Sequence, residues 1–247
     1  MSNSDRRVGS DDASQTEASR RKNSEFFLDE YESYKQQVAS IDTYSSISAA
    51  IDKEIVGISS LLDIGNGGVF DYDASLVGNI TGLDLFLDAL PKSIVLPPNV
   101  KMVQGSALSV PDLGKEFDGV VMVMLLHHLV GKSVAECFSN AKKAIEEAYR
   151  VLRPGGKFIL AESCVPSWFF AFEKIVFKPS SWVIERTIKH PPTLQFVDTH
   201  LIEMMNSAGF RETYVTRIPK GRFVLQYGIK VPAFATPVQP AIFVGTK

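Results

Sequence analysis

The sequence contains little cysteine: only Cys137 and Cys164 occur among 247 residues. Two cysteines exclude a disulfide-rich scaffold and a four-cysteine zinc site. They suit a reducing compartment, so we expect a cytoplasmic protein.

No apolar run reaches the roughly 20 residues of a membrane-spanning helix, so no integral membrane segment is predicted. A charge excess is also missing, because 26 basic and 28 acidic residues leave a net charge of −2. Without a basic excess, we expect no nucleic-acid partner.

Large apolar side chains are nearly absent from residues 1–24, which mix both signs of charge. Such a composition cannot repay the entropy of ordering the chain, and it lacks the apolar core of a signal peptide. We therefore expect a disordered tail there. The whole chain is 45% hydrophobic and 22% charged, as globular domains are, so residues 25–247 are predicted to form a single domain.

Helical spacing of apolar residues predicts one or two helices over residues 25–57, and from residue 58 short apolar strands alternate with helices. The predicted strands are residues 58–64, 79–84, 100–103, 117–124, 157–162, 213–218 and 241–245. The clearest helix covers residues 134–152, with an apolar stripe on one face and charges on the other. This alternation predicts an α/β fold with a mostly parallel, doubly wound sheet.

A glycine cluster, Asp63-Ile64-Gly65-Asn66-Gly67, follows the first predicted strand, and Asp84 ends the second. Glycines at this place let a ligand approach the backbone closely, and an acid at the second strand's tip can accept hydrogen bonds from ribose hydroxyls. Taken alone, the cluster leaves open a plain strand-to-helix turn. Phe70 stands where the dinucleotide fingerprint has a third glycine or alanine, which argues against a nicotinamide dehydrogenase.

Six short motifs occur in order along the chain. They are Asp63-Ile64-Gly65-Asn66-Gly67, Leu83-Asp84, Gly105-Ser106-Ala107, Phe117-Asp118, Leu126-His127-His128-Leu129 and Leu152-Arg153-Pro154-Gly155-Gly156-Lys157. Together they resemble the class I S-adenosylmethionine-dependent methyltransferases, particularly the small-molecule methyltransferase-11 group. The resemblance covers residues 58–165 well and residues 198–247 in outline. It implies a Rossmann-like, seven-stranded sheet whose last strand is antiparallel, and S-adenosyl-L-methionine as the cofactor.

The same resemblance implies the cofactor-binding residues by their positions in these motifs. They are Asp63, Gly65, Asn66, Gly67, Asp84, Leu85, Ser106, Ala107, Met124 and Leu125. The glycine cluster would shape the pocket for the methionine half, Asp84 would hold the ribose, and Ser106 and Ala107 would lie beside the adenine. This chain departs from the family pattern at two positions: Val69 stands where a third glycine is common, and Ser106 where aspartate is common.

Methyl transfer to a hydroxyl or amine benefits from a base that removes the acceptor's proton. His127 and His128 follow the fourth predicted strand, where relatives place acceptor-facing groups, and both are candidate catalytic residues. A hydrogen-bonded structural role is the alternative for each. Since adjacent residues at a strand end point to opposite sides, we expect at most one of them to face the site. His190 is expected in a loop, and His200 in a structural role. No cluster has metal-ligand spacing, so no metal site is predicted.

Two segments outside the matched motifs, residues 166–197 and 219–240, are rich in large apolar side chains. We interpret them as substrate lid insertions around a cofactor-binding core of residues 58–165. The expected reaction is methyl transfer to an oxygen, nitrogen or carbon of a small, partly apolar organic acceptor: a secondary metabolite, a sugar or a lipid-like molecule. Two alternatives stay open, a non-methylating isomerase or cyclase on the same fold and a non-catalytic partner subunit. A homodimer through the apolar lid also stays open.

Overall fold

A computed structural model describes most of the chain from residue 42 onward. The described residues are 42–87, 94–114, 116–175, 177, 193–220, 223–224, 230–232, 234 and 236–247. The predicted tail, the part of the N-terminal helices before residue 42 and His190 lie outside them.

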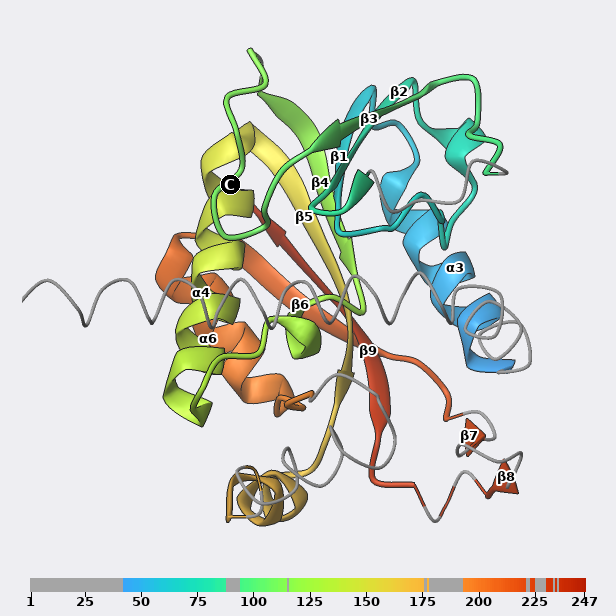
Figure 1. Cartoon of the computed structure of the whole chain (residues 1–247). Coiled ribbons are helices and arrows are strands. Elements are labelled where there is room, and N and C mark those ends of the chain that lie inside the picture. Colours follow the sequence, from blue (N-terminus) through green and yellow to red (C-terminus); the bar gives the residue numbers. More distant parts are fainter. Residues whose placement is uncertain are drawn as a thin grey trace, which may run out of the picture.

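The centre of the fold is a seven-stranded sheet with the strand order β3-β2-β1-β4-β5-β9-β6 (Figure 1). The strands are β1 (Ser60–Ile64), β2 (Asn79–Asp84), β3 (Val100–Gln104), β4 (Phe117–Val123), β5 (Leu152–Cys164), β6 (Arg211–Arg217) and β9 (Gln239–Thr246). β1 to β5 pair in parallel, whereas β9 runs antiparallel to both of its neighbours, β5 and β6. The predicted α/β fold with an antiparallel last strand is confirmed.

Helices cover both faces of the sheet: α3 (Asp42–Ile55) on one side, and α4 (Val134–Val151) with α6 (Asp198–Ala208) on the other (Figure 1). Ile47, Ile51 and Ile55 recur every four residues and form the buried stripe of α3. Burying each such side chain contributes about 1.5–3 kcal/mol. The Ser133 hydroxyl caps α4 by accepting a hydrogen bond from the Glu136 N–H at 3.2 Å, and Gly209 ends α6 with φ 107°.

The expectation that helices alternate with every strand is wrong in the first half of the sheet. The connection from β1 to β2 contains only the short 3-10 helix η1 (Ala74–Leu76), and the described residues between β3 and β4 contain no helix. Gly65, Gly67 and Gly68 all have positive φ, which excludes an α-helix from the first residues of this connection. The short crossover therefore keeps the loop after β1 irregular.

The carboxyl ends of the parallel strands meet at one edge of the sheet, where α/β folds bind their ligands. The chain segments after β5 and before β9 leave the sheet at this edge, because Cys164 at the end of β5 pairs with Gln239 at the start of β9. The first insertion begins with helical residues 167–175, drawn in gold at the foot of Figure 1. The second contains a two-stranded sheet of β7 (Phe223–Val224) and β8 (Lys230–Val231).

Candidate active site

Asp84 ties the glycine loop to the end of β2. One carboxylate oxygen accepts a hydrogen bond from the Gly67 N–H and the other from the Phe86 N–H, both at 2.9 Å. Gly65 has a positive φ of 80°, and its N–H donates a hydrogen bond to the Leu83 carbonyl at 2.7 Å. Because each carboxylate oxygen has further acceptor capacity, Asp84 can hold the loop and still accept hydrogen bonds from a ligand.

Asp63 lies beneath this loop and is almost completely buried. The Tyr72 hydroxyl donates a hydrogen bond to Asp63 Oδ2 at 2.8 Å, whereas Oδ1 and the buried amide nitrogen of Asn66 have no hydrogen-bond partner. Burial raises the pKa of Asp63 to about 7, although the Asn66 amide and the Tyr72 hydroxyl oppose the shift. Tyr72 was not predicted, because no motif marks it and only the short crossover places it beside Asp63.

The end of β4 lies against the glycine loop. A Cβ atom built on Gly65 would come within 2.6 Å of Leu125 Cδ1, so any side chain at this position would have to displace this leucine. Met124 has the rare left-handed φ of 50°, and its N–H donates to the Ala161 carbonyl at 2.8 Å. Strained residues of this kind concentrate at functional sites. The structure thus brings the predicted residues of the loop and of β4 into contact.

Three further predicted residues follow β2 and β3. Leu85 comes directly after β2, and its carbonyl accepts a hydrogen bond from the Gln104 side chain at 3.2 Å. Ser106 and Ala107 lie in the turn after β3, where the Ser106 hydroxyl accepts a hydrogen bond from the Leu108 N–H at 3.2 Å. These residues lie at the same edge of the sheet as Asp84, because β2 and β3 are parallel neighbours and Asp84 pairs with Gln104.

This edge fits a polar, nucleotide-like ligand. A buried polar atom without a partner is costly, and such atoms are normally satisfied by water or a ligand. Asp63 Oδ1 and the Asn66 amide nitrogen have no hydrogen bond of normal geometry, although the amide lies close enough to lower the pKa of Asp63, and both lie beside glycines whose backbone a ligand can approach closely. Asp84 adds a carboxylate with spare acceptor capacity at the tip of β2. The two carboxyl groups can accept hydrogen bonds, so they suit a ligand with an ammonium group and ribose hydroxyls.

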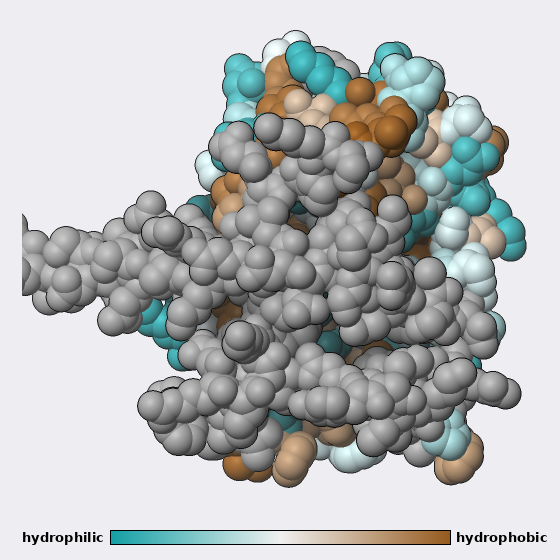
Figure 2. Space-filling model, turned by 45° about the vertical axis from the view of Figure 1, so that its right-hand side comes forward, coloured by the Kyte–Doolittle hydropathy of each residue, from teal (hydrophilic) through white to brown (hydrophobic). Residues whose placement is uncertain are grey.

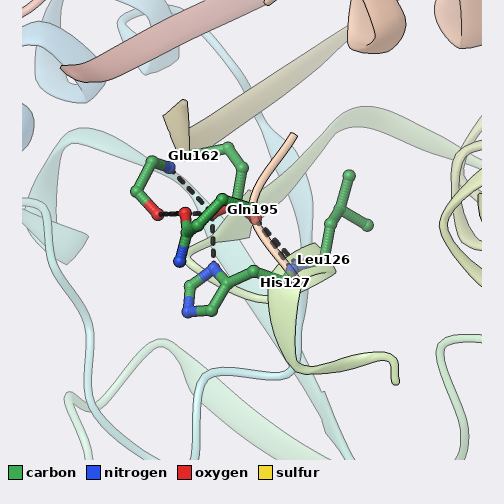
Figure 3. Close-up of polar contacts among 5 residues, drawn as sticks. Leu126, His127, Glu162 and Gln195 are labelled. Atoms are coloured by element: carbon green, nitrogen blue, oxygen red, sulfur yellow. Dashed lines mark hydrogen bonds and ion pairs between the residues drawn. The ribbon is translucent and has the colours of Figure 1, made fainter. Parts of the chain in front are cut away.

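His127 pairs with Glu162 at the carboxyl ends of β4 and β5 (Figure 3). The His127 Nδ1 atom lies 2.5 Å from Glu162 Oε1. Glu162 is fully buried and also accepts hydrogen bonds from the N–H groups of Leu126 at 2.9 Å and Ser163 at 2.8 Å. A carboxylate at Glu162 only accepts, so it selects the tautomer with the proton on Nδ1, and in the neutral imidazole Nε2 then keeps its lone pair.

Two side chains beyond β5 complete the surroundings of His127. The Gln195 amide oxygen accepts a hydrogen bond from the Ser163 hydroxyl at 2.6 Å (Figure 3), and the Leu194 N–H donates to the His127 carbonyl at 3.2 Å. Glu173 lies near His127, and burial raises its pKa to about 7, opposed by the Gln195 N–H and by His127. Glu173 Oε2 is buried with no partner. Sequence reasoning missed Glu173 and Gln195, because both lie in the first insertion, outside every motif.

The expectation that His127 and His128 point to opposite sides is wrong. Both belong to the 3-10 helix η3 (Leu126–His128), and their ring centroids lie 4.1 Å apart. Alternation across a strand does not apply to a helical turn. His200 is placed differently, since its ring packs edge-on between the rings of Phe138 and Phe170 at centroid distances of 5.0 and 4.9 Å.

The part of the chain that the structure describes contains neither a membrane-spanning helix nor a metal site. None of its helices combines the length and the apolar composition needed to cross a bilayer. Within the same part of the chain, no three His, Cys, Asp or Glu side chains converge as metal ligands would.

The fold and the glycine loop are those of a nucleotide-binding α/β domain, and residues 62–160 match the family model described as "Methyltransferase domain". Two curated relatives are both named demethylmenaquinone methyltransferase. The one from Lactobacillus johnsonii is 27% identical over 62% of this chain and 66% of its own length, just under two thirds. The one from Symbiobacterium thermophilum is 24% identical over 69% of this chain and 75% of its own.

Solved structures share the fold at low sequence identity. Human N-acetylserotonin methyltransferase in complex with S-adenosylmethionine has a TM-score of 0.53 at 15% identity, covering 83% of this chain and 52% of its own. The [4+2]-cyclase SpnF has a TM-score of 0.56 at 18% identity, and the match covers 82% of this chain and 80% of SpnF. The domain match and the curated relatives support an S-adenosylmethionine-dependent methyltransferase, and the complex of the human neighbour indicates S-adenosylmethionine as the cofactor.

Proposed function

We propose that the protein transfers the methyl group of S-adenosylmethionine to a hydroxylated, partly apolar small molecule, with His127 as the base. The observation that carries this proposal is the His127–Glu162 pair, in which a fully buried carboxylate holds Nδ1. Glu162 in turn is held by the backbone of η3 and β5. The pair sits two residues from Leu125, which contacts the glycine loop. Base and cofactor loop therefore lie on the same edge of the sheet.

The protein's own residues then have separate roles. Asp63, Gly65, Asn66 and Gly67 hold the methionine half of the cofactor, and Asp84 holds its ribose. S-adenosylmethionine supplies an activated methyl group, so the protein must align the reactants and exclude water. His127 Nε2 takes the proton of the acceptor hydroxyl while Glu162 keeps the ring in place. The electron pair left on the acceptor forms the new bond to the methyl carbon as the carbon–sulfur bond breaks.

A hydroxylated aromatic ring is the acceptor class that best suits this arrangement. Loss of the hydroxyl proton raises the electron density on the oxygen and on the ortho carbon, so one base serves transfer to either atom. Both curated relatives are named for demethylmenaquinone, an apolar aromatic compound. The apolar insertions beside the site suit an acceptor of that polarity. We therefore propose the reduced form of demethylmenaquinone, or a close analogue, as the first acceptor to test.

The test combines mass spectrometry with one isosteric variant. We expect the wild-type protein to add one methyl group to the reduced acceptor and to release S-adenosylhomocysteine. In His127→Asn the side-chain amide can still donate to Glu162 but cannot act as a base. We expect its turnover to fall by about 100-fold or more, while calorimetry shows an unchanged affinity for S-adenosylmethionine.

Three results would contradict the proposal. An isobaric product would favour the isomerase or cyclase alternative, whose fold SpnF shares. Full turnover by His127→Asn would show that His127 is not the base. A larger loss of turnover in His128→Asn than in His127→Asn would show that His128 is the base.

A further inference from the structure

The helical segment 167–175, which follows β5, turns one face toward the protein. Phe170, Glu173 and Phe177 recur at helical spacing along the chain. Phe177 is buried in one apolar cluster with Leu194, and Phe170 packs against the same cluster. Packing on both sides of Glu173 therefore fixes its position and turns its side chain inward.

A carboxyl group is unusual in this part of the chain. Residues 167–177 contain five aromatic side chains and a single acid, Glu173. Figure 1 draws the segment at the foot of the molecule, and Figure 2 shows hydrophobic residues along the same lower edge. Burying a carboxyl group in such surroundings costs free energy unless hydrogen bonds compensate for the lost water.

The hydrogen bonds of Glu173 compensate only in part. The Gln195 N–H donates a hydrogen bond to its carboxyl group. The second oxygen, Oε2, is buried and receives no hydrogen bond from the described part of the chain. A buried oxygen of this kind is normally satisfied by water or by a ligand. Glu173 therefore presents one acceptor atom to a bound molecule.

Gln195 connects Glu173 to the candidate base. Its backbone N–H holds Glu173, and its side-chain oxygen accepts a hydrogen bond from the Ser163 hydroxyl at 2.6 Å (Figure 3). The Ser163 N–H donates in turn to Glu162, the carboxylate that holds His127. Burial raises the pKa of Glu173 to about 7, and His127 opposes this rise, so the two side chains are close enough to interact. The unsatisfied oxygen of Glu173 therefore lies on the same side of the sheet edge as the base.

We propose that Glu173 determines acceptor specificity by accepting a hydrogen bond from a second hydroxyl group of the acceptor, while His127 takes the proton of the first. The acceptor class is then a dihydroxylated aromatic ring. A ring with one hydroxyl group, or the oxidised quinone, has no second proton to donate and leaves a buried carboxylate unpaired, so the site rejects it. This inference rests on the proposed function for the role of His127 and for the aromatic acceptor.

The experiment is calorimetry of the full chain, loaded with S-adenosylhomocysteine, with naphthalene probes at pH 8 and without oxygen. Glu173 is mostly a carboxylate there, because pH 8 lies above its pKa of about 7. We expect the wild type to bind 1,4-naphthalenediol about tenfold or more tightly than 1-naphthol. Glu173→Gln keeps the shape of the side chain and an oxygen for the Gln195 N–H. It should lose the preference for the diol and bind 1-naphthol as the wild type does.

A third probe tests the direction of the hydrogen bond. In 4-methoxy-1-naphthol the second oxygen has no proton, so it can accept from the amide of Glu173→Gln but cannot donate to a carboxylate. We expect this variant to bind the methyl ether more tightly than the wild type does. The matched control is Glu203→Gln, which removes an exposed carboxylate from α6 and should keep the wild-type preferences. Unchanged S-adenosylhomocysteine affinity in both variants shows that they fold.

The role of Glu173 is overturned if the wild type binds the diol and 1-naphthol equally, or if Glu173→Gln keeps the full preference, in which case water satisfies Oε2. An equal loss of affinity for all three probes would also overturn it, because Glu173 would then support the site without contacting the second hydroxyl group. The expected preferences without any methyl transfer would count against the proposed function alone. Methyl transfer that depends on His127 but shows no preference for the diol would count against the role of Glu173 alone.

Discussion

At the scale of single residues, the candidate site is defined by carboxyl groups that the fold buries. Asp63 and Glu162 are both buried at the carboxyl ends of strands, yet their surroundings differ. Glu162 accepts hydrogen bonds from the backbone and from His127. Asp63 has one partner, Tyr72, and one oxygen with none. Glu162 is therefore fixed in place by its hydrogen bonds, whereas Asp63 is a buried carboxyl group that readily retains its proton.

The raised pKa of Asp63 makes a prediction about stability and pH. Burial raises it from 3.8 in an unfolded chain to about 7 in the fold. The folded state therefore retains a proton that the unfolded state releases, and the stabilisation is present below pH 4 and lost as the pH rises through about 7. Asp71 and Glu173, whose pKa values burial raises to about 6 and about 7, act in the same direction.

Asp63→Asn should remove the contribution of Asp63. When the pH rises from 5 to 8, we expect the wild type to lose about 2–3 kcal/mol more of its free energy of unfolding than the variant loses. Denaturant unfolding at the two pH values measures this difference. Glu146→Gln, a change of an exposed carboxylate on α4, serves as the control and should leave the pH dependence unaltered. Parallel curves for Asp63→Asn and the wild type would contradict the assignment.

At the scale of elements, the loop after β1 depends on a close approach to β4. Gly65 and Gly155 have nearly the same backbone angle, φ 80° and φ 76°. They differ in their surroundings, because a Cβ on Gly65 would meet Leu125 whereas one on Gly155 would meet nothing within 4 Å. Substitutions at these two glycines therefore distinguish the loss of stability caused by the backbone angle from the loss caused by the contact with Leu125.

The corresponding alanine variants test that contact. Both should lose about 1–2 kcal/mol of stability from the left-handed backbone angle. Gly65→Ala should lose about 1–3 kcal/mol more from overpacking against Leu125 and should bind S-adenosylmethionine more weakly. Denaturant unfolding and calorimetry measure the two effects, and Leu125→Ala in the same chain should restore part of the stability. Equal losses in the two alanine variants would show that Leu125 does not constrain the loop.

At the scale of the whole molecule, a cofactor that binds only the folded state must stabilise the entire domain. At 100 times its dissociation constant, S-adenosylmethionine should add about 2.7 kcal/mol, which corresponds to about 5–10 °C in Tm for a domain of this size. Thermal unfolding with and without the cofactor measures the shift, and a nicotinamide dinucleotide serves as the control ligand. Asp84→Ala should weaken the affinity by about 1–3 kcal/mol. An equal shift in Asp84→Ala would mean that Asp84 does not hold the ribose.

The sequence alone determined the sheet and the class of protein, because both depend on local patterns. Apolar strands, the glycine loop directly after β1 and an acid at the tip of β2 are readable within a few residues. Only the short helix η1 forms between β1 and β2, where a longer helix was expected, and glycines with positive φ exclude a helix from residues 65–68. The cofactor-binding positions rest on the same motifs and stay predictions.

Only the tertiary structure decided which groups act together. His127 and Glu162 are 35 residues apart in the chain and meet because β4 and β5 are parallel neighbours. Glu173 reaches His127 from an insertion that no motif marks, and its pKa depends on burial that sequence does not reveal. The sequence also did not reveal that Trp168, Phe172 and Ile175 are exposed, whereas Phe170 and Phe177 occupy the inner face of the same segment. Long-range packing, which sequence patterns do not encode residue by residue, sets these pairings.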